Sequence, residues 1–191
     1  MSALSNLPSE LVIRFVKTHF KERNSYHLAD LSCGNGRHML FMLREGHVVA
    51  GTDSSTRNVE SAQQLLTKHG FEPLIIQANL TNLPFENEQF DGLLCEHMLM
   101  FLNQQELEQA IGELYRILKP GGKCFITVRN TNDTLFRTGN TLEDHTFIHF
   151  FTEEEIHQLF KAFMNVTIGV KRFSQNSLTQ YSSEYLITLV K

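Results

Sequence analysis

The stretch LADLSCGNGRHML, residues 28–40, decides the fold. An apolar run ending in Asp30 and Leu31 is followed by a turn with Gly34 and Gly36, and then by a segment with helical composition. Such a strand–turn–helix unit favours a ligand at the carboxyl end of the strand. Glycine lets the backbone approach a ligand closely, and the helix N-terminus presents N–H groups to it. The stretch therefore predicts the first βα unit of a parallel sheet.

Strands and helices alternate on the carboxyl side of this unit. The predicted strands are short apolar runs at residues 27–32, 48–53, 73–78, 90–95, 123–128, 166–173 and 184–190. An N-terminal amphipathic helix is expected with Pro8 near its first turn, because Leu7, Leu11, Phe15 and His19 are one turn apart. Pro120-Gly121-Gly122 is expected to end a later helix.

Two segments have the spacing of a capping box, Asn103 with Glu106 and Thr152 with Glu155. Each is expected to begin a helix. The alternation predicts an α/β fold with a parallel sheet covered on both faces. Because only a turn separates the last two strands, one of them is expected to be antiparallel. No repeat or linker divides the chain, so we expect one domain over residues 1–191.

Composition restricts the class of protein. The 191 residues are 41% apolar, carry a net charge of −4 and contain no cluster of lysine or arginine, so nucleic acid is not an expected partner. Cys33, Cys95 and Cys124 lack the spacing of a zinc site or a disulfide framework. No signal peptide or membrane span is recognised, and a cytoplasmic domain is expected.

A second acidic residue, Asp53, ends the second predicted strand. This position suits a carboxylate that accepts hydrogen bonds from two adjacent ribose hydroxyls. The dinucleotide fingerprint needs a third glycine where this chain has Met39, which favours a mononucleoside ligand over NAD or FAD. A tight turn without any ligand is the structural alternative.

DLSCGNGRH resembles the first motif of class I S-adenosylmethionine-dependent methyltransferases. Four further segments resemble this family in the same order, namely VVAGTDSS, NLTNLPFENEQFD, LYRILKPGGKCFI and HFFTEEEIHQLF. The resemblance implies a three-layer sandwich around a seven-stranded sheet of order 3-2-1-4-5-7-6, with strand 7 antiparallel. It implies S-adenosylmethionine as cofactor and S-adenosylhomocysteine as product.

The resemblance also implies roles for single residues. Asp30 and the backbone of Ser32, Cys33, Gly34, Asn35 and Gly36 would hold the amino-acid end of the cofactor. Asp53 would bind the ribose, and Ser54 would lie beside the adenine. Asn79 and Leu80 would meet the adenine edge, and Cys95 would lie under the cofactor. Ser32 departs from the family, which mostly has glycine there, and Asn79 stands where an aspartate is frequent.

Methyl transfer from a sulfonium requires alignment of the acceptor and exclusion of water, and a base only if the attacking atom must lose a proton. Glu96 and His97 follow the fourth strand, and His97 is the candidate base. Arg129, His145 and His149 lie at or in a long segment, 130–151, that is expected to contact substrate. No metal site is predicted.

The sequence thus predicts a methyltransferase acting on an oxygen, nitrogen or sulfur atom of a small molecule. The alternative is a non-catalytic cofactor-binding domain that serves a partner protein.

Overall fold

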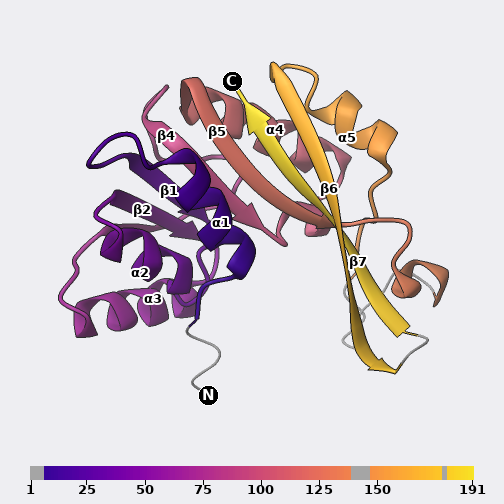
Figure 1. The fold of residues 1–191 in the computed structure, drawn as a ribbon, viewed down its shortest axis with the longest axis horizontal. Coiled ribbons are helices and arrows are strands. Elements are labelled where there is room, and N and C mark those ends of the chain that lie inside the picture. Colours follow the sequence, from indigo (N-terminus) through magenta and orange to yellow (C-terminus); the bar gives the residue numbers. More distant parts are fainter. Residues whose placement is uncertain (1–6, 139–146, 178–179) are drawn as a thin grey trace.

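The computed structural model describes residues 7–138, 147–177 and 180–191, and its centre is a seven-stranded sheet (Figure 1). The strands are β1 (His27–Leu31), β2 (Val48–Asp53), β3 (Leu74–Gln77), β4 (Phe90–Glu96), β5 (Leu118–Arg129), β6 (Asn165–Ser177) and β7 (Gln180–Val190). Their order is β3-β2-β1-β4-β5-β7-β6, and β7 is antiparallel to both of its neighbours. Both the predicted α/β class and the sheet order implied by the family resemblance are confirmed.

Helices cover both faces of the sheet, as Figure 1 shows. The α-helices are α1 (Glu10–His19), α2 (Arg37–Arg44), α3 (Thr56–Lys68), α4 (Gln104–Ile117) and α5 (Glu153–Leu159), and short 3-10 turns are η2 (Leu99–Phe101) and η3 (Thr134–Thr138). One apolar core joins α1, α2 and α3 to the sheet, and a second joins α4 and α5 to its other face. On β4, Leu94 belongs to the first core and Leu93 and Cys95 to the second, as the alternation of a strand buried on both faces requires.

One of the two predicted capping boxes is present in full. At α4, Asn103 accepts from the Glu106 amide and Glu106 accepts from the Asn103 amide, which is a complete capping box. At α5, Thr152 caps the helix, but the Glu155 carboxylate binds His149 instead of the Thr152 backbone. The second prediction is therefore wrong for the bond from the Thr152 amide to the Glu155 carboxylate.

Two other sequence expectations need correction. Leu7 is exposed, because the helix begins only at Glu10, whereas Phe15 of the predicted face is buried together with Val12 and Val16. Residues 120–122 do not separate helix from strand. They form an irregularity within β5, whose pairing with β4 shifts between Phe90 and Gly92.

No helix in the described part of the chain is long and apolar enough to cross a membrane.

Candidate functional site

The loop after β1 is held by its own backbone and by β2. Ser32 has a φ of +70°, Gly34 of +56° and Gly36 of +81°, so three of five consecutive residues are left-handed. That conformation favours glycine, which gives a reason for glycine at the position of Ser32 in the family. At Gly36 a Cβ would also lie 3.0 Å from the Cβ of Ala62 in α3. The glycine therefore permits both the turn and close packing of two helices.

Asp53 joins the ends of β1 and β2. Its Oδ2 accepts from the Gly34 amide at 2.9 Å, and its Oδ1 accepts from the Ser55 amide at 2.9 Å and from the Asn58 side chain at 3.1 Å. The side chain is buried. Since a carboxylate offers about four acceptor positions, some capacity remains for a ligand hydroxyl.

Several loop amides are already bonded. Gly36 N–H donates to the Cys33 carbonyl, Arg37 N–H to the Asn35 side chain, and Cys33 N–H to the Thr52 carbonyl. The loop therefore places carboxylate acceptors, rather than a ring of free amide donors, next to the expected ligand.

Two buried carboxylates face each other at the ends of β1 and β4. Asp30 Oδ2 and Glu96 Oε2 have no hydrogen-bond partner within the described ranges. His38 of α2 lies between them, with Nε2 3.3 Å from Glu96 and Nδ1 3.9 Å from Asp30. The Arg37 Nε donates to His38 Nε2, which assigns the imidazole proton to Nδ1. Both carboxylates thus remain able to accept from a ligand.

The charges of this cluster are set mainly by burial. Burial, with the negative charges of Glu96 and Asp53, raises the pKa of Asp30 to about 8. The pKa of Glu96 is raised as well, chiefly by burial. Burial and the cation of Arg37 lower the pKa of His38 to about 3, so this imidazole is neutral. A cationic ligand would therefore meet acceptors that it can help to ionise.

His97 follows β4 at the same edge and is also left-handed, with a φ of +55°. Its amide lies 3.1 Å from both the carbonyl and the hydroxyl oxygen of Thr127 in β5, which fixes this conformation. Its Nδ1 lies 3.6 Å from Oε1 of Glu184 in β7. Glu184 is reached because β7 runs antiparallel and begins at the edge where the parallel strands end.

The residues expected around the adenine differ in their exposure to solvent. Ser54 and Asn79 are exposed after β2 and β3, whereas Leu80 is buried. Asn79 forms an isolated bridge with Asn82. Cys95 is fully buried in the core with α4, so its side chain has no surface for a ligand.

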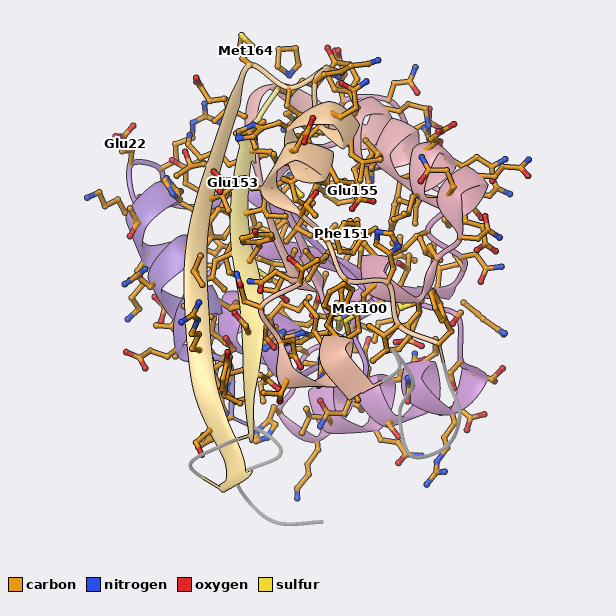
Figure 2. All side chains as sticks on the ribbon, turned by 90° about the vertical axis from the view of Figure 1, so that its right-hand side faces the viewer. Glu22, Met100, Phe151, Glu153, Glu155 and Met164 are labelled. Carbon is orange, nitrogen blue, oxygen red and sulfur yellow. The ribbon has the colours of Figure 1, made fainter. Side chains whose placement is uncertain are left out.

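The remaining substrate candidates do not form one group. Arg129 pairs with buried Asp133 at 3.6 Å. His149 binds Glu155 at 2.6 Å, and its amide donates to the Met100 carbonyl. This contact joins η2 to the segment before α5, where Figure 2 shows Met100 and Phe151 beneath the helix. His145 lies outside the described residues.

Sequence reasoning missed His38, Thr127 and Glu184. His38 is the last residue of the DLSCGNGRH motif, and a buried histidine beside two acids has no local signal beyond that position. Thr127 and Glu184 come from strands whose pairing sets their place. No group of three or more potential metal ligands is found in the part of the chain that the structure describes.

Comparison with known proteins identifies the family to which the chain belongs. Residues 29–126, just over half of the chain, match the family model described as "Methyltransferase domain". This span includes the loop, Asp53 and His97, and it ends within β5.

Relatives and solved structures extend this match. The chain is 35% identical over 103 residues to a 2-phytyl-1,4-naphtoquinone methyltransferase of Nostoc punctiforme, covering 51% of this chain and 44% of that protein. It is 27% identical over 145 residues to the tRNA N(3)-methylcytidine methyltransferase Mettl2 of Drosophila melanogaster, covering 66% of this chain and 45% of that protein. The chain thus spans about half the length of the curated relatives it matches.

One similar solved structure is the Burkholderia thailandensis 1,6-didemethyltoxoflavin-N1-methyltransferase with bound 1,6-didemethyltoxoflavin and S-adenosylhomocysteine. Its TM-score is 0.74 at 18% identity, covering 95% of this chain and 77% of that one. At this identity the likeness shows the fold.

Proposed function

Because the chain belongs to the methyltransferase domain family, we propose that it binds S-adenosylmethionine at the loop after β1 and transfers the methyl group to a small molecule. The observation that carries this proposal is the junction of Gly34 and Asp53, which brings the glycine loop and the acid of β2 into contact at 2.9 Å.

The residues at this edge fit the cofactor chemically. S-adenosylmethionine carries an ammonium group and a sulfonium, and it offers two ribose hydroxyls as donors. The unpartnered oxygens of Asp30 and Glu96 supply buried acceptors for a cation. Asp53 has acceptor capacity for a hydroxyl, and the open space at Gly34, where a Cβ would meet nothing within 4 Å, leaves room beside the backbone.

When bound, the cofactor supplies both the methyl group and its leaving group, so the chain needs no nucleophile of its own. The chain binds the cofactor through Asp30 and Asp53 and aligns the acceptor. The side chains at the carboxyl ends of β4 and β5, namely Glu96, His97 and Arg129, lie at the edge where an acceptor would approach.

A small-molecule acceptor is supported by two similar proteins, a 2-phytyl-1,4-naphtoquinone methyltransferase and a 1,6-didemethyltoxoflavin-N1-methyltransferase. The net charge of −4 argues against RNA, although one relative is a tRNA methyltransferase.

Calorimetry with S-adenosylmethionine and S-adenosylhomocysteine tests cofactor binding. Asp53→Ala is expected to weaken binding by tens- to hundredfold, since hydrogen bonds to a charged group contribute about 1.5–3 kcal/mol each. Asp91→Asn is the matched control. Asp91 also accepts a backbone N–H, from His27, but it lies at the opposite edge of the sheet. No binding of either ligand to the wild type below about millimolar would overturn the assignment.

Incubation with methyl-labelled cofactor and a cell extract separates the enzyme from a binding module. The extract is divided into small-molecule and RNA fractions before incubation. We expect label in the small-molecule fraction. Label in RNA would contradict the proposed acceptor class, and cofactor binding without label in either fraction would favour the non-catalytic alternative.

A further inference from the structure

His97 and Glu184 form an arrangement that cofactor binding alone does not explain. Ser32 and His97 directly follow β1 and β4, which are neighbours in the sheet, and both have a positive φ without being glycine. Such strain persists where surrounding contacts enforce it, and it gathers at functional sites. At His97 the enforcing contact is the pair of 3.1 Å distances from its amide to Thr127.

Glu184 is placed behind the imidazole. Its side chain is only 6% exposed, whereas the His97 side chain is 41% exposed, so the acid is inside and the ring is open to a ligand. The ring nitrogen that faces Glu184 is Nδ1, at 3.6 Å, which leaves Nε2 directed elsewhere. Distances beyond hydrogen-bond length are common between catalytic groups before substrate is bound.

The neighbours of Glu184 leave it available to His97. Arg129, directly opposite Glu184 across β5 and β7, pairs with Asp133. Asp133 also accepts from the amides of Leu135 and Ser183, which holds it in place. The cations of Lys171 and Arg129 also act on Glu184, but Arg129 forms its ion pair with Asp133, and Nδ1 of His97 lies 3.6 Å from the Glu184 carboxylate.

Resting on the function proposed above, we propose that His97 is the base that removes the acceptor's hydroxyl proton, with Glu184 as its positioning residue, and that the acceptor is a phenol. The phenolic oxygen forms the bond to the methyl group. The electron pair of the S–CH₃ bond returns to sulfur, and the hydroxyl proton passes to Nε2 of His97. The imidazolium then releases this proton to water.

The charges around His97 keep it ready to accept a proton. They come from all the elements that surround it: Arg37 and His38 of α2, Glu96 of β4, Arg129 of β5, Lys171 of β6 and Glu184 of β7. Burial lowers the pKa of His97, Glu96 opposes this, and the cations of Arg129, Lys171 and Arg37 add to it. The ring is therefore neutral at pH 7.

A weak base restricts the acceptor. An imidazole with a lowered pKa can take a proton from a phenol, whose pKa is near 10, much more readily than from an aliphatic alcohol. Acceptors without a proton on the attacking atom, such as thioethers, would have no need of this pair.

NMR titration of the histidine ring signals tests the pair without turnover. The His97 signal is assigned by its absence in His97→Gln. In Glu184→Gln the pKa of His97 is expected to fall by about 0.5–1 unit through loss of the neighbouring negative charge, and Glu184→Asp should restore part of it. Glu153→Gln is the control, because Glu153 faces His157 in an exposed pair on α5. An unchanged His97 pKa in Glu184→Gln would overturn the role of Glu184.

The acceptor class is tested with 4-nitrophenol, whose ionised form absorbs visible light, added to protein saturated with S-adenosylhomocysteine. We expect the bound phenol to ionise about one pH unit lower in the wild type than in His97→Gln. Equal ionisation in the two proteins would overturn the base assignment. Calorimetry in the same samples separates the two failures: absent S-adenosylhomocysteine binding refutes the proposed cofactor, whereas normal binding with equal ionisation refutes only the base.

Discussion

The amide of Gly34 donates to Oδ2 of Asp53 over 2.9 Å, and this single bond connects the loop after β1 to the last residue of β2. Two strand ends that are separate in the sequence thus form one rigid edge before any ligand is bound. Pre-organisation of this kind reduces the ordering cost of binding. The stability of this edge depends on the backbone conformation of the loop after β1.

Gly36→Ala is expected to destabilise the fold more than Gly34→Ala. Both residues are left-handed, which costs alanine about 1–2 kcal/mol. At Gly36 the new methyl group would also lie 3.0 Å from Ala62, whereas nothing lies within 4 Å at Gly34. Overpacking adds about 1–3 kcal/mol. Urea unfolding measures both variants, and equal losses would show that the contact between α2 and α3 tolerates the methyl group.

Ser32→Gly is expected to raise the free energy of unfolding by about 0.5 kcal/mol, because relief of left-handed strain exceeds the added entropy of the unfolded glycine. Ser32→Ala keeps the strain and removes only the hydroxyl, so it serves as the comparison. If the alanine variant is stabilised as much as the glycine variant, backbone strain is not the reason.

Asp30→Asn should make the protein less sensitive to rising pH. Burial and neighbouring acids raise the pKa of Asp30 to about 8 in the folded state. Between about pH 4 and 8 the folded chain therefore holds a proton that the unfolded chain has released, and stability falls as the pH rises through this window. We expect Asp30→Asn to be more stable than the wild type at pH 8.5 by at least about 1 kcal/mol, relative to the difference at pH 5.

Asp91→Asn is the control in this experiment, because the pH dependence from Asp91 lies in acid, below the ordinary pKa of 3.8, and not between pH 5 and 8.5. Burial acts to raise the pKa of Asp91, but the His27 amide and the Lys119 ammonium outweigh it, so the pKa is lowered. Its stabilising contribution is present at neutral pH and is lost in acid. A wild-type stability that does not change between pH 5 and 8.5 would contradict the assignment for Asp30.

Asn103→Ala is expected to cost about 1 kcal/mol, since it removes the acceptor of the capping box at α4. Gln104→Ala, one residue later on an exposed position, should cost much less. Chemical unfolding gives both values, and similar losses would mean that the box does not stabilise the helix start.

The sequence was most informative where local pattern and tertiary contact agree. β2 has the predicted bounds, because an apolar run ends in an acid whose carboxylate the next turn requires. The loop after β1 and the antiparallel hairpin were likewise predicted. The start of β5 was not, because Pro120-Gly121-Gly122 has the composition of a turn, and it lies within a strand only because Leu118 and Lys123 on either side of it pair with β4.

How well a residue near the candidate site can be placed from the sequence depends on the same distinction. Residues at the carboxyl end of a parallel strand or directly after it, such as Asp30 and His97, can be placed from the chain order alone. Glu184 could not, since its position depends on the register between β5 and β7. Cys95 was placed under the cofactor, but the alternation along β4 turns its side chain into the core.

The family model ends at residue 126, whereas Arg129, Asp133 and Glu184 all follow it. The half of the molecule that would hold the cofactor is thus one uninterrupted stretch of sequence. The carboxylate next to His97, that of Glu184, lies in the C-terminal β6–β7 hairpin. A related protein could change its acceptor chemistry by altering that hairpin while leaving the nucleoside site intact. In this fold the antiparallel strand β7 therefore belongs to a segment that can vary in sequence independently of the cofactor-binding half.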